Sequence, residues 1–245
     1  MRFLLAIFLL FTALPMTHSQ MEVSDFTFGF QLSPTISWMA TDDNRINGNG
    51  ANLGLKIGTT GEYYLTENYS IIAGIHFAFN QGGQLFYEQG GNLLPKTELS
   101  INLPDGNLPN NVDIRYSMQF LEIPLGFKMR TNQIGNMSYY AQFPIFTLGF
   151  NTNAKADIKG GSQASFTVNT ENERINDEIP FLRLFWSVGA GAEYQLGGNT
   201  FLIGGLGYQS NFGDIVKGGG TRFDGSKDRS SAKIHSLIFK LGVKF

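Results

Sequence analysis

The feature that most constrains the fold is a strict alternation of apolar and polar side chains, clearest in residues 26–38. One set of alternate positions there is apolar throughout, and the other holds only Thr, Gly, Gln and Ser. Successive side chains of a β-strand point to opposite faces, so this period of two predicts a strand with one wholly apolar face. No long helical pattern follows residue 20, and we therefore expect an all-β fold.

The same alternation recurs along the chain. Five further segments show it clearly: 52–60, 68–80, 119–130, 182–196 and 235–245. Two less regular segments, near 138–151 and 199–212, are assigned as strands from their spacing as much as from their pattern. Pro144 predicts a bulge or bend in the first of these two. The sequence thus predicts eight strands.

The links between these strands are alternately long and short. The long links are 40–50, 81–113, 152–179 and 211–231, and the short ones are 61–67, 131–137 and 196–199. Bacterial outer-membrane barrels place long loops outside the cell and short turns in the periplasm. The pattern therefore predicts an eight-stranded antiparallel up-and-down transmembrane β-barrel with both ends of the chain in the periplasm.

A soluble barrel such as a lipocalin shares the period of two but turns its apolar face inward. Here the polar positions hold mostly small residues, which suit the crowded interior of an eight-stranded barrel. The apolar positions lack central charges, as expected for a lipid-facing surface, where a midplane Arg or Lys costs about 2–4 kcal/mol. Charged residues are only 16% of the chain, against the typical quarter. We therefore expect the apolar face to point outward into lipid.

The charges in the polar phase are of both signs and are predicted to form a network in a filled lumen. Its expected members are Lys56, Glu122, Lys128, Arg130, Arg183, Glu193 and Lys240. Glu122 is expected to pair with Lys128 or Arg130, and Arg183 with Glu193; Lys244 also faces the lumen. Such a narrow barrel has little room for an open pore.

Residues 1–20 are interpreted as a cleaved signal peptide, which leaves residues 21–245 as a single barrel domain exported through the Sec pathway to a bacterial outer membrane. Arg2 precedes the apolar run 3–14, which is too short for a membrane anchor. The chain has no cysteine, which excludes disulfides and thiolate metal sites. Its net charge of −2 offers no footprint for nucleic acid.

Several residues are candidates for chemical sites, but no catalytic residue, cofactor or metal is predicted from them. Residues 189–194 resemble a dinucleotide-binding loop only in part, because the third glycine is missing and no helix follows; the glycines are interpreted as close packing. The acidic loop residues do not match a calcium loop: Asp42, Asp43, Asp224 and Asp228, with Asn44. A proton relay of His235 with Asp42 or Asp43 at the outer rim is conceivable, but His235 lies in the outward phase. His76 is expected to be a hydrogen-bonded lumen residue.

Three segments resemble known outer-membrane sequences. IHSLIFKLGVKF (234–245) resembles the terminal strand that the barrel-assembly machinery reads, with Phe239, Leu241, Val243 and Phe245 as its outward residues. FLEIPLGFKMR (120–130) resembles the YLEIPL-x-x-K strand of the PorT-like barrel family of Bacteroidota, although Phe120 replaces the usual Tyr. Residues 185–215 are similar to a later hairpin of that family. The resemblance implies a small barrel, and the founding member of the family belongs to type IX secretion and gliding machinery.

Taken together, the sequence predicts a structural or interaction protein, surrounded by outer-membrane lipid and lipopolysaccharide. The long links 81–113 and 152–179 are expected to face envelope protein partners. The alternatives are a component of a secretion or gliding machine, a soluble periplasmic lipocalin-like carrier, and a rim-catalytic hydrolase or acyltransferase.

Overall fold

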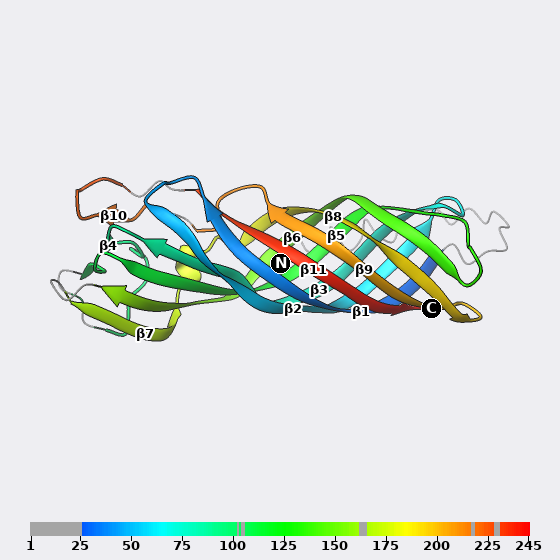
Figure 1. The fold of residues 1–245 in the computed structure, drawn as a ribbon, viewed down its shortest axis with the longest axis horizontal. Helices are drawn as coiled ribbons and strands as arrows, with labels where there is room; N and C mark the ends of the chain where they lie inside the picture. The colour runs from blue at the N-terminus through cyan, green and yellow to red at the C-terminus, as the bar shows by residue number, and fades with distance from the viewer. Residues whose placement is uncertain (1–25, 102, 104–105, 162–165, 217–218, 228–230) are drawn as a thin grey trace, which may run out of the picture.

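The computed structural model describes residues 26–245 except 102, 104–105, 162–165, 217–218 and 228–230. The predicted signal peptide therefore lies outside the described residues. Eight antiparallel strands close into a barrel, as predicted, because the first pairs with the last (Figure 1). These strands are β1 (Phe26–Thr41), β2 (Ile46–Tyr64), β3 (Tyr69–Tyr87), β5 (Val112–Arg130), β6 (Met137–Gly161), β8 (Leu182–Gly197), β9 (Thr200–Asn211) and β11 (Ala232–Lys244).

Smaller elements lie in the links. They are β4 (Gly91–Asn92), β7 (Thr167–Arg174), the 3-10 helix η2 (Asn176–Glu178) and β10 (Thr221–Arg222). β7 pairs with β6, and β4 pairs with β10. The bend expected at Pro144 is present as a register shift between Gln142 and Ile145 in the β6–β8 pairing. Among the described residues, no helix is long and apolar enough to cross a membrane.

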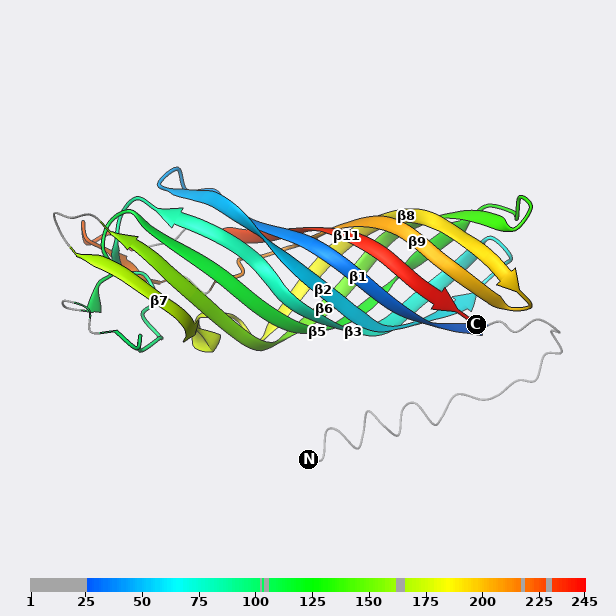
Figure 2. The same ribbon diagram turned by 60° about the horizontal axis from the view of Figure 1, so that its bottom comes forward.

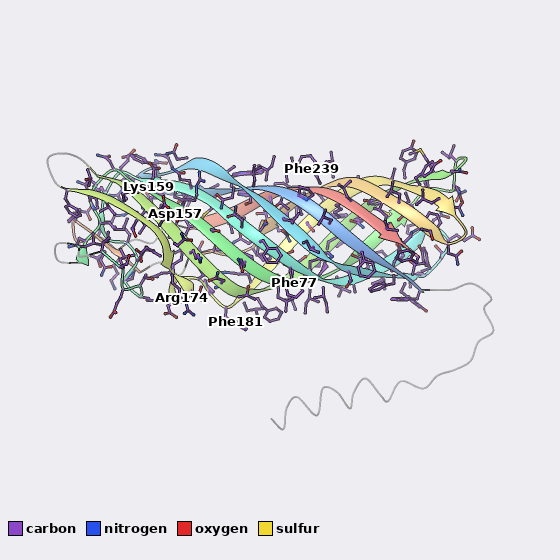
Figure 3. All side chains as sticks on the ribbon, turned by 90° about the horizontal axis from the view of Figure 1, so that it is seen from below. Phe77, Asp157, Lys159, Arg174, Phe181 and Phe239 are labelled. Carbon is purple, nitrogen blue, oxygen red and sulfur yellow. The ribbon has the colours of Figure 1, made fainter. Side chains whose placement is uncertain are left out.

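The barrel carries its apolar side chains on the outside. Phe30, Leu125 and Leu241 are 57%, 57% and 53% exposed, whereas the inward Ser33 and Ser37 are fully buried. Side chains labelled on the barrel wall, among them Phe77, point away from it (Figure 3). A surface of this kind is stable in lipid and unfavourable in water. The lipocalin-like alternative, which needs the opposite orientation, is therefore wrong.

Several strands are longer than the sequence predicted, and the links are correspondingly shorter. The link expected at 40–50 is a turn of residues 42–45, and the link expected at 81–113 spans only 88–111. Most of the link expected at 152–179 is strand, because β6 runs on to Gly161 and turns back as β7. The short turns are close to expectation at 65–68, 131–136 and 198–199.

The missed strand segments have an inverted polarity, which β5 shows most clearly. In residues 112–118 the inward side chains are apolar and at most 1% exposed, and they are Val112, Ile114, Tyr116 and Met118. The outward side chains of that segment include Asp113 and Arg115. Beyond residue 120 the same inward phase holds Glu122 and Lys128, and the outward phase is apolar. The outward face of residues 112–118 is therefore suited to water, and the outward face beyond residue 120 is suited to lipid.

The inverted segments form a folded layer above the lipid-facing barrel, which we call the outer platform. It comprises residues 81–87 of β3, 112–118 of β5, 153–161 of β6, all of β7 and the described part of the link 88–111. β3, β5 and β6 run past the ends of β8 and β9 toward β7 (Figure 2). An apolar core lies inside the platform, with buried residues that include Leu85, Leu94, Leu108, Ile158, Val168 and Ile175.

Candidate functional site: a closed lumen beneath an outer platform

The middle of the lumen holds an isolated ion pair between Lys56 and Glu122. Lys56 Nζ donates to both carboxylate oxygens of Glu122, at 2.8 and 2.7 Å, and to Gln209 Oε1 at 2.5 Å. Both charged side chains are almost fully buried, with 4% and 3% exposure. They reach each other across the lumen from β2 and β5, which are separated by β3.

Nearer the short turns, two carboxylates and three cations form what we call the ion cluster. Its members are Glu62, Lys128, Arg130, Glu193 and Lys244. Lys128 bonds both carboxylates, with Nζ 2.9 Å from Glu62 Oε2. Lys244 Nζ lies 2.8 Å from Glu193 Oε2. Every basic member thus contacts both acids, and the cluster ties β2, β5, β8 and β11 together across the lumen.

The predicted network members are distributed differently from expectation. Glu122 pairs with Lys56, so its expected pairing with Lys128 or Arg130 is wrong. Arg183 does not pair with Glu193, because it lies at the opposite end of β8, where it interacts electrostatically with Asp214. Lys240 reaches no carboxylate among the residues that the structure describes, and it donates instead to Gln142 Oε1. The side chain of His76 contacts Thr60, with 3.2 Å between Nε2 and Oγ1.

Glu62 is the main lumen residue that the sequence prediction missed. The segment 61–67 was assigned to a tight turn, but β2 continues to Tyr64 and holds Glu62 inward and buried. A signal was present, since Glu62 continues the even-numbered polar phase that includes Lys56, Gly58 and Thr60. Tyr64 completes the cluster, accepting a hydrogen bond from Arg130 at 2.8 Å.

Apolar side chains fill the lumen at the level of the outer platform. The rings of Phe120 and Phe185 pack edge to face with centroids 5.6 Å apart. The hydroxyls of Tyr87 and Tyr116 are 2.9 Å apart, and Met118 beside them is fully buried. Two small cavities lie in the described part of the lumen, among the ion pairs and below the packed rings, with volumes of about 50 and 30 Å³.

The outward face of the platform is charged and faces solvent. Asp157 and Lys159 on β6 and Arg174 on β7 lie on the platform (Figure 3). Lys159 Nζ is 2.6 Å from Glu171 Oε1 on the neighbouring strand. A hollow of about 220 Å³ opens on this face, lined by Gln84, Asp113, Arg115, Asp157 and Lys159. In register, Arg115 lies opposite Asp157, and Asp113 lies opposite Lys159.

Within the platform, two carboxylates hold the link 88–111 against β7 and η2. The backbone N–H of Lys96 donates to Glu178 Oε1 at 2.6 Å, and that of Ser100 donates to Glu173 Oε2 at 3.1 Å. The hydroxyls of Ser100 and Thr170 also donate to Glu173. Burial raises the pKa of Glu173, but these hydrogen bonds outweigh burial and hold the pKa below its ordinary value.

The acidic residues of the outer turns are tied to basic neighbours rather than gathered around an ion site. Asp43 pairs with Arg222. Burial raises the pKa of Asp43, but the hydrogen bond from the Arg45 N–H and the Arg222 guanidinium lower it below its ordinary value. Asp224 lies 3.5 Å from Arg45. Asp228 lies outside the described residues. In the part of the chain that the structure describes, no three acidic or histidine side chains are grouped to hold a metal.

An aromatic cluster occupies the outward face where β1, β8, β9 and β11 meet. His235 stacks on Trp38 and Tyr208, with ring centroids 5.7 and 6.1 Å apart, and its Nδ1 lies 2.7 Å from the Tyr208 hydroxyl. Trp186 packs against Tyr208 at 5.6 Å. Asp42, the expected partner of His235, accepts from the Ser231 N–H instead. The relay required by the rim-catalytic alternative is therefore not assembled, and the cluster has the composition of an interfacial girdle.

These features define the class of the protein as a small closed β-barrel of the bacterial outer membrane. Its wall is apolar, its polar lumen is closed by ion pairs and rings, and its platform is charged. Sequence comparison agrees with this class. The chain belongs to the family described as "Outer membrane protein beta-barrel domain", whose sequence profile matches residues 18–217.

Solved structures with the same type of fold include the neisserial surface protein A, at 12% identity and a TM-score of 0.43, covering 89% of this chain and 95% of that chain. Ail of Yersinia pestis shows 13% identity and a TM-score of 0.39, over 90% of this chain and 99% of that chain. The outer membrane protease OmpT of Escherichia coli shows 9% identity and a TM-score of 0.39, over 94% and 99% of the two chains. A comparison with curated proteins finds no match.

Proposed function

We propose that this protein is a non-conducting outer-membrane barrel whose outer platform binds another macromolecule at the cell surface. The observation that carries the proposal is the inversion of polarity along β5, which adds an apolar core above the lipid-facing wall. Anchoring in lipid needs only the wall. Three strands that continue well beyond the wall and pack with β7 around a core therefore point to a role for the platform itself.

The geometry supports binding in two further ways. The links 81–113 and 152–179 were expected to be loops, but β3 continues to Tyr87 and most of 152–179 is strand in β6 and β7. Much of the platform surface is therefore ordered before a partner arrives. Its outward face also carries charges of both signs around the hollow beside Arg115 and Asp157. Such a face favours a partner with complementary charges over a purely apolar one.

Site-directed photo-cross-linking in intact cells tests this proposal. A photo-reactive amino acid in place of Lys159 is expected to give a discrete adduct with a surface macromolecule. The matched position is Leu125, outward on the lipid-facing wall, where only lipid adducts are expected. Identical adduct patterns at the two positions would rule out a binding role for the platform.

A second candidate role rests on the likeness of residues 120–130 and 185–215 to the PorT-like family. That likeness favours an accessory role in a type IX secretion or gliding machine. The terminal strand supports assembly by the barrel-assembly machinery, since Phe239, Leu241 and Phe245 are all exposed on its outward face. Deletion of the gene is expected to block export of cargo proteins if the secretion role holds; unchanged export would remove it.

A further inference from the structure

Among the described residues of the lumen, Lys240 forms no ion pair with a carboxylate. Lys240 lies on the inward phase of β11 and lines both lumen cavities. Among the described residues, the only hydrogen-bond partner of its Nζ is the neutral Gln142 Oε1. An ammonium group has three N–H donors, so two remain for a ligand in the cavities.

A second unmet donor faces the smaller cavity. The Tyr140 side chain is 4% exposed, its hydroxyl has no hydrogen-bond partner in the structure, and it lines this cavity together with Lys240. Buried hydroxyls are nearly always hydrogen-bonded, so an unmatched one indicates that a group at this place remains to be supplied.

Three glycines make room for these two donors. A Cβ at Gly191 or Gly205 would come within 2.6 or 2.4 Å of the Tyr140 hydroxyl. A Cβ at Gly189 would come within 2.9 Å of Lys240 Nζ. The partial dinucleotide-like pattern at 189–194 therefore has a different meaning: its glycines allow both donors to project over β8 and β9.

The charges that face the lumen in the membrane-spanning strands do not balance. Arg183, at the outer end of β8, interacts with Asp214 and is left out of this count. Among the other described lumen residues, five basic side chains meet three carboxylates, which leaves an excess of two positive charges: Lys56, Lys128, Arg130, Lys240 and Lys244 against Glu62, Glu122 and Glu193. The carboxylates are already bonded within the ion cluster and the Lys56 pair. Buried charges are normally paired, so a negative counter-charge is expected near Lys240.

We propose that the lumen binds a small monovalent anion of the halide class between Lys240 and Tyr140. Both residues line the cavity of about 30 Å³, which has room for one halide. Lys240 also lines the cavity of about 50 Å³, which has room for a few waters. The ammonium of Lys240 supplies charge and N–H donors, and Tyr140 supplies an O–H donor. The anion fills a gap in the filled lumen and adds an ionic link between β6 and β11. This site is independent of the outer platform.

The test uses the full-length barrel, purified in detergent, with chloride or bromide titrated against gluconate at constant ionic strength. The wild type is expected to show a saturable rise in its unfolding midpoint of about 3–6 °C. Lys240→Met and Tyr140→Phe are expected to lose this rise. The control Lys233→Gln makes a similar change of charge at the exposed end of the same strand and is expected to keep it.

Crystals grown in bromide provide a second, direct measurement that does not depend on reversible unfolding. An anomalous peak between Lys240 Nζ and the Tyr140 hydroxyl is expected in the wild type, and none in Lys240→Met. Water alone at that position in bromide crystals would overturn the proposal. So would an equal halide response in the wild type and Lys240→Met.

Discussion

Each carboxylate of the ion cluster contacts three cations, so the loss of one carboxylate affects the whole cluster. Glu193 is bonded to Lys128, Arg130 and Lys244, and its side chain is 1% exposed. Removing its charge leaves three buried cations around Glu62 alone. Breaking a buried ion pair by removing one partner typically costs about 3–5 kcal/mol.

We therefore expect Glu193→Gln to lower the free energy of unfolding by about 3–5 kcal/mol. Denaturant titration followed by the heat-dependent shift in gel mobility measures this change. Glu171→Gln, which removes an exposed partner of Lys159, is the control and should have little effect. Equal stability of the two variants would mean that the ion cluster does not hold the strands together.

The hydrogen bonds of Glu173 predict a pH dependence confined to the platform. The folded-state pKa of Glu173 lies below its unfolded value, so its stabilising contribution is present above the unfolded pKa. That contribution is lost as the pH falls through the lowered folded pKa. Hydrogen exchange of the Ser100 amide, compared between neutral pH and pH values below the ordinary carboxyl pKa after correction for intrinsic rates, is expected to show weaker protection in acid. Glu173→Gln should show weak protection of the Ser100 amide at every pH. If this variant keeps the pH dependence, another titrating group is responsible for it.

At the scale of single residues, the sequence indicated which side chains face the lumen better than which of them meet. The even-numbered polar phase of β5 places Glu122, Lys128 and Arg130 inward, as expected. Partners across a barrel depend on strand stagger and on side-chain reach, and neither is visible in the alternation of one strand. For that reason Lys56 was not foreseen as the partner of Glu122.

At the scale of elements, β5 shows why strand boundaries were misjudged. β5 keeps one inward phase throughout, but the polarity of that phase reverses near residue 120. The apolar outward phase that predicts the strand therefore begins only there. Residues 112–118 alternate as regularly as 121–130 do, but with the apolar positions on the other face. The alternation itself, whichever face is apolar, extends over the whole strand. The tight turn 42–45 was missed similarly, because the polar, glycine-rich start of β2 resembles a loop.

The reversal predicts position-dependent effects of one substitution on the outward face of β5. Leu125→Arg places a charge in the lipid-facing wall and is expected to cost about 2–4 kcal/mol. Ser117→Arg on the platform faces water and is expected to cost much less, with only an exposed hydrogen bond to Asn80 lost. The amount of heat-modifiable barrel recovered from membranes measures both. Equal recovery would place both residues in the same medium.

At the scale of the whole molecule, the lumen is blocked by two unlike layers. Packed rings such as Phe120 and Phe185 fill the level of the platform, and ion pairs fill the barrel below. We therefore expect no discrete channel openings from the purified protein in planar bilayers, with an open porin as the positive control. Regular unitary openings that scale with protein concentration would show that one of the layers is mobile.

The aromatic cluster provides an intrinsic spectroscopic probe of barrel closure. The chain has two tryptophans, and both contact Tyr208, with ring centroids 6.4 Å away for Trp38 and 5.6 Å for Trp186. Trp38 is on the first strand and Trp186 on β8, so the two indoles approach only after β1 has joined β11. Coupling between the indoles in near-ultraviolet circular dichroism should therefore mark the last zipping step of refolding, without any attached label.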